Sequence, residues 1–204
     1  MKVYVNTDIV DYKYVVKSVS FDSQKEVKET YVELKDNSKL KASVTLQNGK
    51  ITVKVPNKKI EGELLYRLSR DGDQISTFHL LCDNKGPTLT LFETIEGTKG
   101  GIYTPLSWDS NSEWKNDMDT FMFNLNKNQK YKKLKNNDSI CCNNSSGPWT
   151  YGFGFHGNNQ MRKIQHGGSN INSQYENGAE ILPNNSSTAK YFEIKEVEVY
   201  KITI

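Results

Sequence analysis

The sequence lacks the marks of a membrane or secreted protein. No apolar run approaches the length of a membrane span, and the opening residues turn polar by Asn6, too early for a signal peptide. Three cysteines, two of them adjacent, are too few for a disulfide framework. We therefore expect a cytoplasmic protein, in which the sequons at Asn144 and Asn185 carry no sugar.

Charge of one sign is also scarce. The net charge is +3, whereas nucleic-acid-binding domains concentrate basic residues on one face. The one basic cluster lies between Lys127 and Lys135. It allows binding of RNA, an acidic partner or a membrane surface, or it is a solvated turn and edge strand whose lysines discourage edge pairing. We favour the last interpretation and expect no nucleic-acid partner.

Long helical patterns are missing, and so is the alternation of strands and helices that is typical of parallel sheets. Eleven tyrosines and eight phenylalanines suit pleated, half-buried surfaces. These patterns predict a mainly β fold, a two-layer antiparallel β-sandwich with a few short peripheral helices.

The most informative stretch is 71–108. Ile75, Phe78 and Cys82 share one face of a predicted helix, with His79 beside them and Asp73 as its cap. Gly86-Pro87 ends the helix. Leucine and threonine then alternate over 88–91, which predicts a half-buried strand, and Gly100-Gly101 begins its returning partner.

The ends of the chain are rich in predicted strands. Asn48-Gly49 between two alternating runs predicts a β-hairpin. We divide the chain into a β-rich region of unknown role, 1–59, and a sandwich domain, 60–204; the first region is either the outer part of one sheet or a separate appendage. The apolar phase of 191–204 changes twice, which predicts a bulge near Lys195-Glu196 and a second near Tyr200.

The order of these motifs resembles the TLDc domain of the oxidation-resistance proteins, in the form found in single-celled eukaryotes. The resemblance covers about 62–202. The residues that carry it are 64–67, 69–72, Phe78, His79, Cys82, Asp83, 85–91, Gly100, Gly101, Tyr103, 108–110, 121–125, 151–154 and 192–200. Two departures are Asp73-Gln74, where the family has an aromatic or small residue, and the first sixty residues, which match no known pattern.

The resemblance implies a β-sandwich with short helices at its edge. It also implies a non-enzymatic role in oxidative-stress protection, with binding to peripheral subunits of the V-type proton ATPase in several members. It carries over no catalytic residue and no cofactor. The family-motif positions, which we expect to be structural, are Ser69, Asp71, Gly72, Gly86, Pro87, Gly100, Gly101, Trp108 and Glu196.

Candidate chemistry is sparse. Cys82 and His79 lie three apart on one helix face, so they are either a peroxide-reactive thiol with its base or two core residues; we favour the core. Asp71-Gly72 predicts a turn locked by an aspartate–backbone bond and an arginine. Cys141-Cys142 lacks zinc-site spacing, so no metal is expected.

These observations predict a non-catalytic module that acts through protein contacts. The alternatives are a thiol-based peroxide-reactive enzyme that uses Cys82 and His79, and a binder of acidic surfaces or nucleic acid through the lysines from Lys127 to Lys135. The sequence gives neither the oligomeric state nor the role of 1–59.

Overall fold

The computed structural model describes residues 3–7, 12–16, 27–34, 39–47, 50–55, 58–156, 160–166, 168–182 and 190–203. Before Glu61 only the course of the strands is described. The chain divides into two compact units, Met1–Leu64 with Ile202–Ile204, and Leu65–Lys201.

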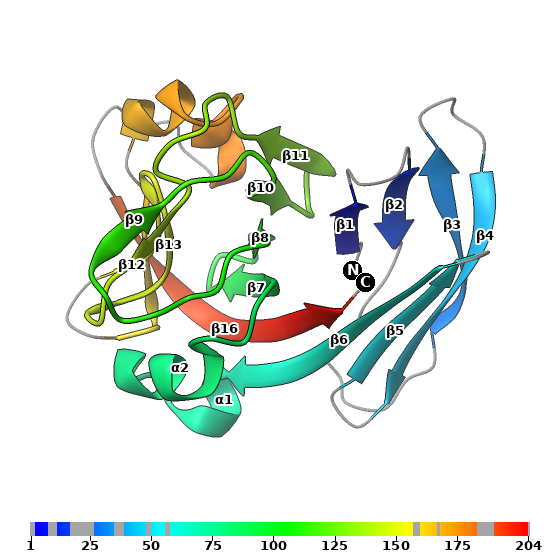
Figure 1. Ribbon diagram of the computed structural model, residues 1–204, viewed down its shortest axis with the longest axis horizontal. Helices are drawn as coiled ribbons and strands as arrows, with labels where there is room; N and C mark the ends of the chain where they lie inside the picture. The colour runs from blue at the N-terminus through cyan, green and yellow to red at the C-terminus, as the bar shows by residue number, and fades with distance from the viewer. Residues whose placement is uncertain are drawn as a thin grey trace. The chain divides into compact units, whose positions relative to one another are not determined.

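The first unit is an antiparallel sheet in which successive strands are neighbours (Figure 1). On the β4–β5 pair, Gln47 lies opposite Lys50, which confirms the two-residue hairpin predicted from Asn48-Gly49. The strands of this unit are β1 (Val3–Thr7), β2 (Tyr12–Val16), β3 (Val27–Leu34), β4 (Lys39–Gln47), β5 (Lys50–Val55) and β6 (Lys58–Arg67), the last of which continues into the second unit.

The second unit contains two antiparallel sheets that share one long strand, β16 (Lys190–Thr203). One sheet has the order β16-β7-β8-β10-β11, and the other runs β13-β14-β15-β16. The remaining strands are β7 (Thr88–Thr94), β8 (Lys99–Thr104), β10 (Phe121–Asn124), β11 (Gln129–Lys132), β13 (Ser146–Thr150), β14 (Phe153–His156), β15 (Lys163–His166) and a separate ribbon of β9 (Glu113–Lys115) with β12 (Ile140–Cys142).

The predicted fold class is confirmed. Phe92 of β7 packs against Phe153 of β14, with ring centroids 5.7 Å apart, so apolar side chains of the two sheets meet in one core. The helices of the described part of the chain are short: α1 (Leu68–Asp71), α2 (Ile75–Cys82), and the 3₁₀ turns η1 (Gly168–Ser173) and η2 (Gly178–Ile181). The result is a mainly β fold with antiparallel sheets, consistent with a sandwich.

The bulge predicted near Lys195-Glu196 is confirmed. Ile194 pairs with Thr94 and Glu196 with Glu93, so Lys195 is an extra residue on β16. The bulge lies near the start of the part of the strand that pairs with β7, just after the part that pairs with β15. The second predicted bulge is wrong, because β16 pairs with β7 without interruption from Glu196 to Lys201.

Helix α2 has the predicted inner face, since Ile75, Phe78, His79 and Cys82 are all buried. The predicted cap is wrong. The residue before the helix is Gln74, which makes no side-chain capping bond, and Asp73 instead accepts a hydrogen bond from Arg162 at 3.1 Å. The Asp73 carboxylate therefore forms a long-range ion pair with Arg162 and does not cap α2.

The half-buried strand predicted at 88–91 is wrong in one respect, since β7 is buried on both faces. The hydroxyls of Thr88 and Thr94 have hydrogen-bond partners inside, whereas the buried Thr90 hydroxyl has none among the described residues. The Trp108 indole donates from Nε1 to the Thr88 hydroxyl at 2.8 Å. A β-branched residue that forms a hydrogen bond is compatible with a buried strand, so alternation of leucine and threonine does not identify a solvent face.

Candidate functional site

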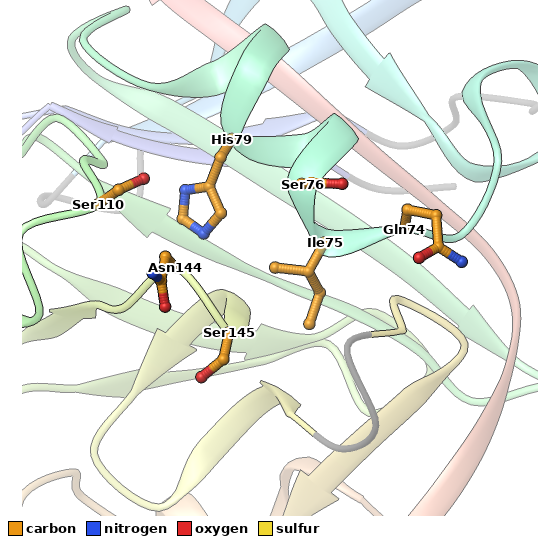
Figure 2. A pocket seen from close by; sticks show the side chains of 7 residues that line it. All are labelled: Gln74, Ile75, Ser76, His79, Ser110, Asn144 and Ser145. Carbon is orange, nitrogen blue, oxygen red and sulfur yellow. The ribbon is translucent and has the colours of Figure 1, made fainter.

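A polar pocket lies where α2 begins. Three segments line it: the start of α2, the loop after β8 and the turn between β12 and β13 (Figure 2). Its cavity volume is about 490 Å³, and its lining residues are Gln74, Ile75, Ser76, His79, Ser110, Asn144 and Ser145. Except for Ile75 these side chains carry hydrogen-bonding groups, so the pocket is suited to polar ligands.

His79 forms one wall of this pocket and connects its three segments. The ring nitrogen Nδ1 lies 2.9 Å from a carboxylate oxygen of Asp83, and Nε2 lies 3.0 Å from the Asn143 carbonyl and 2.9 Å from the Ser146 carbonyl. Asp83 also accepts a hydrogen bond from the Ser110 hydroxyl at 2.8 Å. The ring is buried and packs edge-on against Phe78.

An aspartate–histidine pair beside a pocket with three serines resembles part of a hydrolytic triad, but the geometry differs. In a triad the second ring nitrogen accepts the proton of a nucleophile. Here Nε2 faces two backbone carbonyl oxygens, which have no proton to give. The arrangement joins segments of the chain to one another.

Cys82 does not line the pocket. Its side chain is fully buried in the core, and burial raises the pKa of the thiol well above its usual range. A buried, neutral thiol is a poor nucleophile. Cys82 and His79 share the inner face of α2, as the spacing predicts, but His79 turns to Asp83 and the β12–β13 turn.

A second cluster of polar groups lies where β6 meets α1, beside β16. Glu198 is 2% exposed, and one of its oxygens accepts from Arg67 Nε at 2.6 Å while the other accepts from the Tyr200 hydroxyl at 2.8 Å. Burial raises the pKa of Glu198, against the lowering effect of Tyr200 and Arg67. Glu196 accepts a hydrogen bond from the backbone amide of Ser69.

The Asp71 turn belongs to the same cluster. The Asp71 carboxylate accepts from the backbone amide of Arg67 at 2.8 Å and from Arg70 Nε at 2.7 Å. Burial raises the pKa of Asp71, but these hydrogen bonds outweigh it and hold the pKa below its usual range. Gly72 follows with φ of +84°, a backbone conformation that glycine adopts without strain. The structure therefore brings Ser69, Asp71, Gly72 and Glu196 together.

The other family-motif residues lie apart from this cluster. Gly86 has φ of +84° and leads through Pro87 into β7. Gly100 and Gly101 lie in β8, and a Cβ atom on Gly101 would meet the Thr90 carbonyl oxygen and the Phe123 ring. These glycines permit a turn and a close contact between strands, and Trp108 is a core residue.

The basic cluster does not form one continuous charged surface. Lys133 is 6% exposed, donates to the Asp138 carbonyl at 3.2 Å, and has its pKa lowered by burial. Lys127 donates to the Glu180 carbonyl at 2.7 Å, and Lys130 lies 3.9 Å from the centre of the Phe121 ring. Successive residues of an extended segment point to opposite faces, so Lys132 is exposed while Lys133, next to it, is buried.

Metal ligands and membrane spans are not found in the described ranges. Cys141 and Cys142 lie on opposite sides of β12, with only Cys142 buried in the core. No group of three or more His, Cys, Asp or Glu side chains within the described ranges has the geometry to hold a metal ion. No described helix is long and apolar enough to cross a membrane.

A family model, the TLDc domain, matches residues 35–203. The chain belongs to the TLDc domain family. The match begins upstream of residue 62, where the sequence motifs start, so residues 35–59 also fall within the TLDc match. No curated protein gives a significant match to the chain.

Sequence reasoning missed two features of this TLDc domain. The pocket residues Ser110, Asn144 and Ser145 lie on loops far apart in the sequence, and no local pattern groups them. The Arg67–Glu198 pair joins β6 to β16 across most of the chain. Glu198 shares its face of β16 with the buried Tyr200 and Ile202, and this was the available signal, because a buried charge requires a partner.

Proposed function

We propose that this TLDc domain is a non-catalytic module that acts through protein–protein contacts in the cytoplasm, in oxidative-stress protection, in regulation of the V-type proton ATPase, or in both. The observation that carries the proposal is the family match over most of the chain. The resemblance of the motifs to the oxidation-resistance proteins supplies the process and the partner, the peripheral subunits of the pump.

The chemistry of the site supports a binding role over a thiol enzyme. A peroxide-reactive cysteine needs an exposed thiol with a low pKa. Cys82 is fully buried, with its pKa raised, and the pocket-lining histidine, His79, is held by acceptors on both nitrogens. A protein partner needs none of these groups to react.

Binding of the full chain to the purified peripheral part of the pump tests the proposed partner. We expect a saturable complex by biolayer interferometry. Exposed apolar side chains are the usual anchors of protein contacts, so Leu80→Asp on α2, where Leu80 is 81% exposed, and Ile95→Asp, at a position 65% exposed, map the docking face. An equally charged β-sandwich from another family is the control. Binding no stronger than that of the control contradicts the pump as partner.

Peroxide consumption by the purified chain tests the non-catalytic part separately. We expect the rate to equal that of the Cys82→Ser variant and of buffer containing free cysteine at the same concentration. Turnover that is lost on Cys82→Ser contradicts a non-catalytic module, whatever the pump assay shows.

A further inference from the structure

His79 faces only hydrogen-bond acceptors. Nδ1 is 2.9 Å from the Asp83 carboxylate, and Nε2 is 3.0 and 2.9 Å from two backbone carbonyl oxygens, those of Asn143 and Ser146. Neutral imidazole has one N–H, while imidazolium has two. Only the doubly protonated ring therefore donates a hydrogen bond from both nitrogens in this arrangement.

The two sides of the ring do not compete equally for a single proton. Asp83 is a carboxylate, it forms the stronger charge-assisted bond, and the Ser110 hydroxyl holds its other oxygen at 2.8 Å. A ring that loses one proton therefore keeps the proton on Nδ1. Nε2 then presents a lone pair to the carbonyl oxygens of Asn143 and Ser146, and this contact becomes repulsive.

Loss of the Nε2 proton would release the turn that forms one wall of the pocket. Asn143 and Ser146 flank Asn144 and Ser145, which line the pocket opposite the start of α2 (Figure 2). We propose that protonation of His79 clamps the β12–β13 turn against α2, so that the pocket wall is fixed in acid and released when the ring becomes neutral. The inference is independent of the partner proposed above.

Two histidines lie near this turn: His79, and His156 on β14, whose backbone pairs with Ser146. Asp83 at the end of α2 is its charged partner, and on the loop with Ser110 the Asp109 carboxylate pairs with Lys115. Burial raises the pKa of Cys142 on β12 to about 11, and that of Cys82 on α2 is raised further. Histidine is the side chain that ordinarily changes charge between about pH 5 and 8.

Nuclear magnetic resonance of the full, ¹⁵N-labelled chain tests the clamp. Across a pH titration, we expect both nitrogens of the charged His79 ring to carry protons and only Nδ1 of the neutral ring to carry one. The backbone amide signals of residues 143–146 should move with the same midpoint as the ring. A neutral ring with its proton on Nε2, or a ring that titrates while these amides stay fixed, overturns the proposal.

Two variants separate the clamp from general effects of pH. In Asp83→Asn the neutral ring is free to keep its proton on Nε2, so the turn should stay bound at both pH values and its amides should stop responding. His156→Gln removes the histidine whose backbone pairs with Ser146 and should leave the wild-type response unchanged. Unchanged coupling in Asp83→Asn, or lost coupling in His156→Gln, contradicts the assignment to His79.

Discussion

At the scale of single residues, three buried ionisable side chains of this domain are held by specific partners. Glu198 has Arg67 and Tyr200, Lys133 has a carbonyl and an amide oxygen, and His79 has three acceptors. An unpaired group of this kind costs on the order of 1–3 kcal/mol, more when it is charged. These residues therefore connect strands that are distant in the sequence.

The three cysteines should differ sharply in reactivity. Cys82 and Cys142 are buried, whereas Cys141 is partly exposed. We expect an alkylating reagent to label Cys141 in the folded protein and the other two only on unfolding, because burial both excludes the reagent and raises the pKa of the thiol. Mass spectrometry of peptides after timed labelling measures this, and labelling of Cys82 as fast as Cys141 contradicts it.

Asp71 should make the fold sensitive to acid. Its pKa is lower in the folded chain than the ordinary value, so its contribution to stability is present above that ordinary value and is lost as the pH falls through the folded pKa. Asp71→Asn should reduce the free energy of unfolding by about 1–2 kcal/mol at neutral pH. The difference from the wild type should shrink in acid. Urea unfolding across pH measures it; a difference that grows in acid rules out this sign.

At the scale of elements, backbone crowding in β8 separates two roles of glycine. A Cβ on Gly101 would lie 2.2 Å from the Thr90 carbonyl oxygen, whereas Gly97, in the β7–β8 turn, has open space but φ of +86°. Gly97→Ala should cost about 1 kcal/mol of unfolding free energy, from backbone strain alone. Gly101→Ala should cost more, at least about 2 kcal/mol, from overpacking. Equal costs in thermal unfolding would contradict this distinction.

The sequence predicts elements well where one local rule acts alone. The hairpin at Asn48-Gly49 and the inner face of α2 follow from turn chemistry and helical period. Prediction from sequence fails where a residue distant in the sequence forms a contact that competes with the local one. Asp73 pairs with Arg162 and leaves the helix uncapped, and the Thr88 hydroxyl is buried because Trp108 reaches it. The pocket could not be predicted from the sequence either, because its residues lie on loops, where no periodic pattern shows which residues meet.

At the scale of the whole molecule, the register of β16 fixes which side chains enter the core. Val197 and Val199 are fully buried, and the extra residue Lys195 sets their phase relative to Ile194. Deletion of Lys195 removes the bulge, so one part of the strand must exchange its two faces, which puts Glu198 and Tyr200 where Val197 and Val199 pack.

The deletion should therefore abolish cooperative folding. Misplacing Val197 and Val199, at about 1.5–3 kcal/mol each, and parting the buried Glu198 from Arg67, at about 3–5 kcal/mol, together remove most of the roughly 5–15 kcal/mol of an ordinary domain. The substitution Lys195→Ala keeps the residue count and loses only an exposed ion pair with Glu93, so it should cost less than about 1 kcal/mol. Near-ultraviolet circular dichroism distinguishes them; a native spectrum for the deletion variant refutes the dependence on register.

One consequence follows for how this chain can diverge. β16 belongs to two sheets at once, so an insertion in it shifts the register of both, whereas a substitution changes only its local contacts. Its length should therefore be kept while its sequence changes. Homologues set side by side should show gaps in the loop that carries Ser110 and none between Lys190 and Thr203.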